Sequence, residues 1–254
     1  MRLALLTVRF LEQAGALAQL GGRALARLAR PPFELQAWLR QMDQIGVRSL
    51  GVAGITTVFT GMVLALQTAY SLPGLGVKYY IGTVVSKSLV RELAPVLVAL
   101  IVGGRIGAGM TAELGTMKVT EQIDALRSMA ADPVKKLVVP KLAATLVMLP
   151  ILTLIGNLLG VLGGLLIGIY ELGLTAAFYW NDALSALTIS DVGSGIGKSV
   201  FFAFFITTVA CHNGLTASGG ADGVGRATTN TVVVSSILVL VSDFFLTKIF
   251  YLVG

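Results

Sequence analysis

Long stretches that are apolar and almost free of charge alternate with short charged ones along most of the chain. A helix needs about 20 mostly apolar residues to cross the hydrocarbon core of a bilayer. The stretches that meet this length lie within residues 49–77, 81–104, 142–170, 199–221 and 227–254. We therefore expect five membrane-spanning helices.

Composition agrees with this pattern. The chain of 254 residues is 55% hydrophobic and 13% charged, with a mean hydropathy of +0.84. Soluble domains carry about 25% charged residues, so a large part of this surface cannot face water. The predicted fold class is an all-α integral membrane protein.

The first 48 residues differ from the rest. They hold seven arginines interspersed with leucines, which is typical of a helix lying in the headgroup region of an anionic leaflet. Pro31 and Pro32 should end this helix, and Trp38 would anchor a second one at the interface. A solvated basic arm is the alternative. Arg9 and Glu12 interrupt the apolar stretch too early for a cleavable signal peptide. We expect an interfacial part, 1–48, and a transmembrane part, 49–254.

Lysine and arginine counts in the loops predict the orientation, because cytoplasmic loops carry an excess of both. The N-terminal segment has seven arginines, and residues 111–141 have five lysines and arginines. The loops at 73–80 and 171–198 have one each. The N-terminus and the 111–141 connection are therefore expected in the cytoplasm, with the C-terminus on the opposite side.

Glycines recur at every fourth position in the third predicted span. Gly156, Gly160, Gly164 and Gly168 would form a smooth stripe on a helix, and Gly103 and Gly107 would do the same in the second span. Such stripes allow another helix to approach closely. We interpret both as packing surfaces.

The second predicted span carries charges. Lys87 lies near its outer boundary, whereas Arg91 and Glu92 lie deeper, and Pro95 cannot donate the backbone hydrogen bond that the Arg91 carbonyl would accept in an α-helix. Ionisable residues inside a membrane are costly and usually face a cavity or a partner. The pattern favours a polar substrate-facing site, with a structural ion pair as the alternative.

Residues 193–199, GSGIGKS, resemble a phosphate-binding loop but do not fit one. That loop needs a glycine five positions before the glycine of Gly-Lys-Ser, and Val192 occupies this position. We expect a glycine-rich connection leading into a hydrophobic helix, with Lys198 at its mouth. Cys211 and His212 are the single cysteine and histidine, and we expect them to pack in a helix. The sequence predicts no catalytic residue, metal site or cofactor.

An amphipathic helix is predicted at about 119–129, in the cytoplasmic connection. Its apolar face would hold Val119, Ile123 and Leu126. Its polar side would hold Glu121, Asp124 and Arg127. Such a helix could dock on a partner, or it could lie against the bilayer.

Two segments resemble the MlaE permease family of ABC lipid transporters. They are VRELAPVLVALIVGGRIGAGMTAELGTMKVTEQIDALRSMAADPVKKLVVPK, which starts at Val90, and GGADGVGRATTNTVVVSS, which starts at Gly219. The similarity covers roughly residues 47–254. Ala94 and His212 depart from residues that are usual in the family.

The resemblance implies a homodimeric permease in the bacterial inner membrane, with its C-terminus in the periplasm. It also implies a cytoplasmic ABC ATPase that hydrolyses the ATP, a STAS-domain protein and a periplasmic MCE-domain hexamer as partners, and no nucleic acid. Family members move phospholipids between the inner and outer membranes and so maintain the lipid asymmetry of the outer membrane.

Site residues follow from the same resemblance. The lipid headgroup would be attracted by Arg91 and Lys198, with Glu92 holding Arg91 in the empty site. The acyl chains would lie against Leu64, Tyr70, Leu72 and Leu75, near the outer half of the spans at a dimer interface. The coupling helix for the ATPase would comprise Val119, Glu121, Ile123, Asp124, Leu126 and Arg127.

Two other functions are consistent with the pattern of spans. A self-sufficient secondary transporter or channel could use Arg91, Glu92 and Asp243 as an ion relay. Such transporters commonly contain internal repeats, and five spans do not divide into two equal halves. A membrane scaffold without transport is the third possibility.

Overall fold

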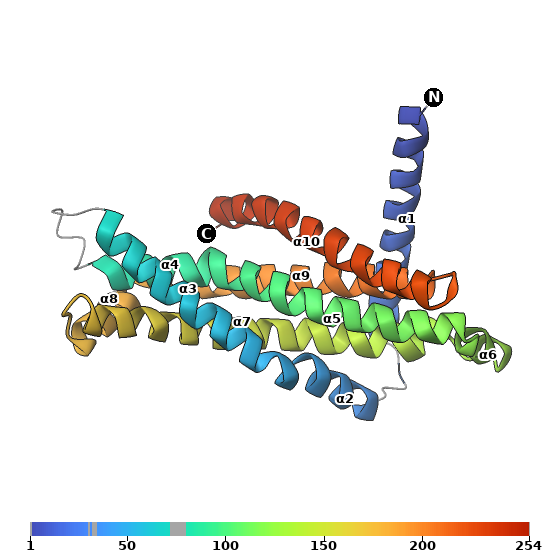
Figure 1. Cartoon of the computed structure of the whole chain (residues 1–254), viewed down its shortest axis with the longest axis horizontal. Helices are drawn as coiled ribbons and strands as arrows, with labels where there is room; N and C mark the ends of the chain where they lie inside the picture. The colour runs from blue at the N-terminus through green and yellow to red at the C-terminus, as the bar shows by residue number, and fades with distance from the viewer. Residues whose placement is uncertain (1, 30, 32–34, 72–79, 254) are drawn as a thin grey trace. The chain divides into compact units, whose positions relative to one another are not determined.

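The computed structural model describes residues 2–29, 31, 35–71 and 80–253, with the backbone alone for residues 2–10 and 253 (Figure 1). All regular elements of these residues are helices. In chain order they are α1 (Arg2–Leu28), α2 (Leu35–Ile45), the 3-10 helix η1 (Val47–Ser49), α3 (Leu50–Ser71), α4 (Ile81–Ser88), the π-helix η3 (Leu89–Leu93), α5 (Ala94–Val119), α6 (Gln122–Ser128), the π-helix η4 (Val134–Val138), α7 (Val139–Tyr170), α8 (Ala176–Ala186), α9 (Ile189–Leu215) and α10 (Gly220–Val253).

The prediction of five spans is confirmed. Five helical segments are long and apolar enough to cross a membrane, and they cover Leu35–Ser71, Ile81–Val119, Val134–Tyr170, Ile189–Leu215 and Gly220–Leu252. The all-α membrane fold expected from the sequence is therefore the observed one.

The expected glycine-rich connection at 193–199 is wrong, because these residues lie inside α9. The helix begins ten residues before the predicted start at Ser199 and ends at Leu215. Gly219 and Gly220 then turn the chain into α10 with φ values of 90° and 67°. Residues other than glycine rarely adopt this left-handed backbone conformation, so glycine suits the turn. The short helix α8 was not predicted at all.

The helix predicted at about 119–129 is shorter than expected. Val119 is the last residue of α5, and Glu121 has a left-handed φ of 60° that separates α5 from α6. Ala130 is also left-handed, with a φ of 56°, just beyond the end of α6. The single predicted helix over 119–129 is therefore two segments with a break between them.

The chain forms two compact units, each made of three segments. Unit 1 comprises Met1–Ile45, Gly103–Leu146 and Ala203–Leu238. Unit 2 comprises Gly46–Val102, Val147–Phe202 and Val239–Gly254. The helices α5, α7, α9 and α10 each contribute residues to both units.

Unit 1 has a core in which Cys211 is fully buried. Ala24, Leu114, Val138 and Leu142 form this core with Cys211. Because Ala24 belongs to α1, the second half of this helix packs into the unit and is not a free basic arm. Its end is fixed to the connection between α6 and α7, where an Arg27 guanidinium nitrogen lies 2.5 Å from a carboxylate oxygen of Asp132.

Unit 2 has a core around Tyr179, which is fully buried although it belongs to the short helix α8. Its hydroxyl donates to the carbonyl of Val161, 3.2 Å away, and burial raises the pKa of Tyr179 well above its ordinary value. The helix α4 packs along α8, where the Asp182 carboxylate accepts hydrogen bonds from the backbone and side chain of Thr83.

The glycine stripe of α7 is a packing surface, as predicted. A β-carbon at Gly160 would lie 2.9 Å from a methyl carbon of Leu89 and 3.1 Å from the carbonyl oxygen of Thr57. In unit 1, a β-carbon at Gly103 would collide with a methyl carbon of Ile206, whereas one at Gly107 would make ordinary contacts at 3.4 Å with Thr231 and 3.5 Å with Ile206. Backbones in each unit therefore approach to distances that larger residues would prevent.

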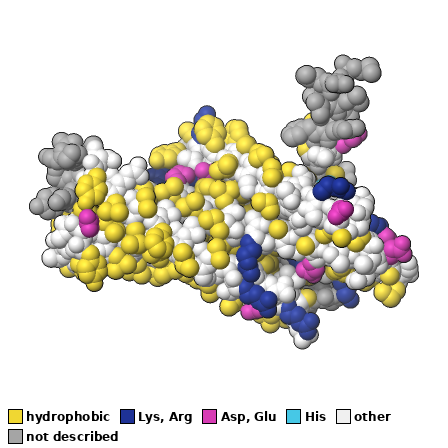
Figure 2. Space-filling view, viewed as in Figure 1, with side chains coloured by type: hydrophobic (Ala, Val, Ile, Leu, Met, Phe, Trp, Pro, Cys, Tyr) yellow, Lys and Arg dark blue, Asp and Glu magenta, His cyan; other side chains and the backbone are white. Residues whose placement is uncertain are grey.

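Apolar side chains cover much of the surface on view in Figure 2. On α3 the exposed side chains Ile55, Phe59 and Val63 follow one another at helical spacing, and on α10 Phe244 and Phe245 are exposed. Such surfaces are unfavourable in water and suit contact with lipid or with other apolar helices.

Candidate functional site

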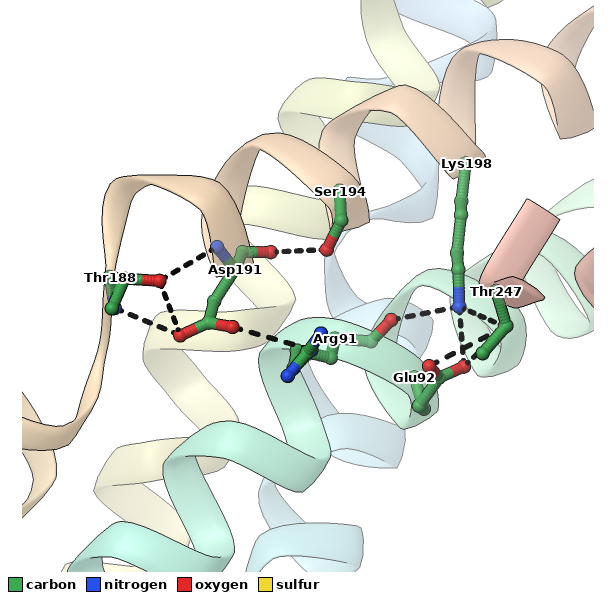
Figure 3. Close-up of polar contacts among 7 residues, drawn as sticks. All are labelled: Arg91, Glu92, Thr188, Asp191, Ser194, Lys198 and Thr247. Atoms are coloured by element: carbon green, nitrogen blue, oxygen red, sulfur yellow. Dashed lines mark hydrogen bonds and ion pairs between the residues drawn. The ribbon is translucent and has the colours of Figure 1, made fainter. Parts of the chain in front are cut away.

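The candidate site is a cluster of charged side chains inside the predicted spans of unit 2 (Figure 3). Lys198 lies at its centre with 1% of its side chain exposed. Its ammonium donates to the Glu92 carboxylate in a short contact and to the Thr247 hydroxyl at 2.7 Å. A charge at this depth is costly without partners, and these partners account for its presence.

The third hydrogen bond of Lys198 involves a backbone group. Its ammonium donates to the carbonyl oxygen of Arg91 at 3.1 Å. Arg91 belongs to the π-helix η3, four residues before Pro95, which has no N–H to offer. The proline therefore leaves a carbonyl group available within the helix, and the lysine from α9 satisfies it.

Two further groups complete the surroundings of Lys198. Oδ1 of Asp243 lies 3.2 Å from the ammonium as an ion pair without hydrogen-bond geometry. The hydroxyl of Thr247 lies 3.2 Å from the Glu92 carboxylate, so α10 contacts both members of the Lys198–Glu92 pair. Asp243, which the sequence suggested as part of an ion relay, is thus placed beside Lys198.

Arg91 contacts a different set of side chains. Its Nε lies 3.3 Å from Oδ1 of Asp191, whose side chain is 6% exposed. Its guanidinium carbon lies 4.4 Å from the centre of the Tyr251 ring, which is a cation–π distance. The Arg91 side chain itself is 28% exposed, so it is the more accessible cation of the cluster.

Asp191 also holds the start of α9. Its Oδ2 accepts hydrogen bonds from the backbone N–H and the hydroxyl of Thr188, at 2.9 and 2.8 Å, and the Thr188 hydroxyl accepts from the Asp191 N–H at 3.3 Å (Figure 3). This reciprocal pair is a capping box. One carboxylate therefore starts the helix and orients Arg91.

The glycines of the GSGIGKS stretch bring α9 close to its neighbours. A β-carbon at Gly195 would collide with the Val90 carbonyl and would lie 3.3 Å from Pro95. A β-carbon at Gly197 would lie 2.8 Å from the Phe250 ring. Small residues here allow the Lys198 ammonium to reach η3 and α10 at once.

The structure corrects one predicted pairing and adds residues to the site. Glu92 binds Lys198, whereas Arg91 binds Asp191, so Glu92 does not hold Arg91 as expected. Asp191, Thr247 and Tyr251 were not predicted. The Thr-x-x-Asp pattern at Thr188 would have revealed Asp191 as a capping residue, but no local pattern points to Thr247 or Tyr251.

The cluster holds two cations, Arg91 and Lys198, and three carboxylates, Glu92, Asp191 and Asp243. Such a set can bind a polar or charged group within the spans. In the part of the chain that the structure describes, no group of three or more His, Cys, Asp or Glu side chains could hold a metal ion.

The residues predicted for acyl chains lie partly outside the described residues, because Leu72 and Leu75 belong to 72–79. Leu64 is half-buried and packs against the core of unit 2. Tyr70 is 66% exposed, and its hydroxyl donates to the Glu171 carboxylate at 3.0 Å. Of Leu64 and Tyr70, only Tyr70 exposes most of its side chain.

The predicted coupling face needs a correction at Ile123, which is fully buried inside unit 1 and cannot contact a partner directly. Leu126 is half-buried and Met129 is 70% exposed.

Asp124 accepts a hydrogen bond from Lys118 at 2.7 Å, and this bond holds the pKa of Asp124 below its ordinary value. Arg127 lies 3.1 Å from the same carboxylate. Val119 is half-buried and Glu121 is exposed.

Comparison with known proteins places this architecture in a family. The family described as Permease MlaE matches residues 38–249. A probable ABC transporter permease protein of Rickettsia typhi is 43% identical over 245 residues, which are 96% of this chain and 95% of the relative. A similar protein of Synechocystis is 39% identical over 232 residues, covering 91% and 88%.

A third relative is the intermembrane phospholipid transport system permease protein MlaE of Haemophilus influenzae. It is 37% identical over 217 residues, which are 85% of this chain and 83% of the relative. The family match at 38–249 covers most of each of the five spans and includes the charged residues Arg91, Glu92, Asp191, Lys198 and Asp243. The comparisons confirm the resemblance seen in the sequence. The chain belongs to the MlaE permease family.

Proposed function

We propose that this chain is the membrane subunit of an ATP-driven transporter that moves phospholipids between the inner and outer membranes of a bacterium and so maintains outer-membrane lipid asymmetry. The observation that carries the proposal is a paired charge cluster inside the spans of a chain from the MlaE permease family. The Haemophilus influenzae relative is named as a phospholipid transport permease, which supports this substrate class.

In this proposal the chain binds and guides the lipid but catalyses no reaction. A separate cytoplasmic ABC ATPase hydrolyses the ATP, and the chain works as a homodimer together with a STAS-domain protein and a periplasmic MCE-domain hexamer. The exposed apolar side chains of α3 and α10 offer surfaces for contact with lipid or with a second copy.

Arg91 is the proposed contact for the lipid phosphate. It is the accessible cation of the cluster, and its guanidinium can match two phosphate oxygens at once. A phosphate would compete with Asp191 for the guanidinium. Lys198 is fully buried and would reach a phosphate only when its contact with Glu92 opens, so we assign it the role of holding η3, α9 and α10 in place until then. Tyr70, with Leu72 and Leu75 of the 72–79 segment, is proposed to contact acyl chains.

The orientation follows from the loop charges, with α6 in the cytoplasm and α8 in the periplasm. Cysteines introduced as Ser128→Cys and Ser185→Cys, both at exposed positions, would test it in a Cys211→Ala background. A membrane-impermeant thiol reagent that crosses only the outer membrane should label position 185 in whole cells and position 128 only after lysis. The reverse pattern would overturn the orientation.

The headgroup role is tested by lipid transport in reconstituted vesicles with Arg91→Gln and Arg91→Lys. We expect Arg91→Gln to lower the transport rate about tenfold or more, because hydrogen bonds to charged groups contribute about 1.5–3 kcal/mol each. Arg91→Lys should retain part of the rate, because it keeps the charge but loses the planar fork. Lys87→Gln, an exposed position one turn earlier, is the matched control and should transport normally.

A charge swap separates this role from a purely structural one. Because Arg91 pairs with Asp191, the informative variant is the double substitution Arg91→Asp with Asp191→Arg. Full transport by this variant would mean that the pair only joins two helices. Transport that stays low, in a protein that folds and inserts normally, supports the contact with phosphate.

A further inference from the structure

A polar hollow lies in unit 1, where α9 ends and α10 begins. Its volume is about 330 Å³, within the range of small-ligand pockets of about 300–1,000 Å³. The polar side chains that line it include Gln13, His212, Asn213, Ser218, Arg226 and Asn230. None of the residues that line this hollow belongs to the charged cluster of unit 2.

The hollow contains a cation without a carboxylate. Arg226 is the arginine of the lining, and among the side chains that the structure describes no aspartate or glutamate lines the same hollow. In the part of the chain that the structure describes, no carboxylate lies within 4.0 Å of its guanidinium, whereas Arg27, Arg91 and Arg127 each contact an aspartate. The charge of Arg226 is therefore available to a ligand.

The position of the guanidinium adds to this charge. A β-carbon at Gly219 would lie 3.5 Å from one of its nitrogens, so the guanidinium lies beside the turn that begins α10. The first N–H groups of a helix have no partner within the helix and carry partial positive charge. Arg226 and this helix start thus act on the same small region.

One lining residue, Asn213, is held in place by hydrogen bonds within unit 1. The Asn213 amide donates to the Thr231 hydroxyl at 2.9 Å, and that hydroxyl lies 2.8 Å from the hydroxyl of Thr111. These bonds join α5, α9 and α10 within unit 1. The Asn213 side of the hollow is therefore already ordered before a ligand binds, which reduces the ordering cost of binding on that side.

We propose that this hollow binds a phosphate group, supplied either by a phospholipid headgroup or by a soluble phosphate ester. The arginine fork matches phosphate oxygens, and the amides of Gln13 and Asn230 and the Ser218 hydroxyl are neutral donors for the remaining oxygens. This site is separate from the proposed transport site, and it does not depend on the proposed function.

An adjacent hollow favours the lipid as the source. It has a volume of about 690 Å³, shares Arg226 and Asn230 with the first, and extends to Val233, which is 51% exposed. A phosphate at Arg226 would thus lie beside a surface that suits an acyl chain. Asp222 also lines this second hollow, and its carboxylate disfavours ligands with a second negative charge.

The test uses the purified full chain in detergent, with a photoreactive amino acid at Val233 and labelled phosphatidylethanolamine. We expect capture several-fold above that at Leu158, an exposed apolar position on α7. Arg226→Gln should lower capture at Val233 about tenfold, because a charge-assisted contact is lost. Arg40→Gln, which removes an exposed arginine of α2, should leave capture unchanged.

A second arm distinguishes the two sources of phosphate. Titration calorimetry with glycerol 3-phosphate measures binding without an acyl chain, in the wild type and in Arg226→Gln. Binding that requires Arg226, without lipid capture, identifies a soluble phosphate ester as the ligand. If neither ligand depends on Arg226, the proposal is overturned. Should Arg226→Gln fail to fold, Arg226→Lys keeps the charge without the fork, and an unchanged affinity in that variant would also contradict the proposal.

Discussion

Lys198 shows how a single residue can determine the arrangement of three helices. Its ammonium is almost completely covered and contacts Glu92, the Arg91 carbonyl, Thr247 and Asp243. Removing one partner of a buried ion pair leaves an uncompensated charge, which typically costs about 3–5 kcal/mol. Glu92 is 37% exposed, so water screens part of this effect and the cost should fall at the lower end of that range.

We predict that Lys198→Met lowers the free energy of unfolding by about 3 kcal/mol, because Glu92 and Asp243 then lack their cation. Adding Glu92→Gln to Lys198→Met should recover part of the loss. Thermal unfolding in detergent measures both variants, with Lys248→Met, in the same helical span as Asp243, as the control. Equal stability of Lys198→Met and the wild type would show that the cluster contributes nothing to folding.

The residues of the site were predicted better than their pairings. Arg91 and Glu92 stand out in the sequence because charges are rare inside apolar stretches. Lys198 was expected just before a span, and its role came from the family resemblance. Which charge meets which depends on how segments roughly 100 residues apart pack together, and helical spacing does not contain that information. Asp191 is different, because Thr188 and Asp191 form a local capping pattern that signals both residues.

At the scale of elements, glycines decide how closely helices approach. Gly160 of α7 lies against Thr57 and Leu89, with no room for a β-carbon, whereas a β-carbon at Gly51 of α3 would meet nothing within 4 Å. The sequence predicted the stripe, because glycine at every fourth position lies on one helix face. The spacing of the glycines alone does not predict which helix packs against the stripe.

These two glycines make a matched pair. We predict that Gly160→Ala lowers the free energy of unfolding by about 1–3 kcal/mol, the usual cost of overpacking. Gly51→Ala should be neutral or slightly stabilising, because alanine favours helix without a new contact. Thermal unfolding of both variants in the same detergent provides the comparison. The packing account would be wrong if the two variants lost equal stability.

The start of α9 illustrates a conflict between local signals. Three glycines within residues 193–197 suggest a loop in a soluble protein, since each costs about 1 kcal/mol in a helix interior. In a membrane bundle, small residues permit close packing, and this advantage outweighs the low helix propensity. The Thr188–Asp191 capping box indicates the observed start of α9 better than the glycines do.

The helix α6 remains the proposed docking element for the ATPase, with a revised surface. Leu126→Asp together with Met129→Asp should sharply reduce retention of the ATPase and lipid transport, because these apolar side chains are the accessible ones. The thermal stability of the chain should change little. Pull-down of the ATPase and vesicle transport measure the effect.

The matched control is Ile123→Asp, which places a charge inside unit 1 and should destabilise the protein itself. If the Leu126/Met129 variant binds the ATPase as well as the wild type does, the docking site lies elsewhere.

The Asp124–Lys118 contact should persist at neutral pH. Because the pKa of Asp124 is lowered, its stabilising contribution is present above the unfolded value of 3.8 and is lost as the pH falls through the folded pKa.

For the whole molecule, membership in the MlaE permease family and the charged cluster support one account: a lipid permease driven by a separate ATPase. A secondary transporter would use the same charges differently, because it would move lipid or ions along an ion gradient without ATP. The phosphate-loop pattern at 193–199 is incomplete, and these residues lie inside a helix.

The most direct measurement is ATP-dependent movement of a fluorescent phospholipid in vesicles that contain this chain and its cytoplasmic ATPase. We predict movement that requires both proteins and ATP, and that is strongly reduced by Arg91→Gln but not by Lys87→Gln. Absence of ATP-dependent movement in a correctly assembled complex would contradict the account, as would movement driven by an ion gradient in vesicles with the chain alone.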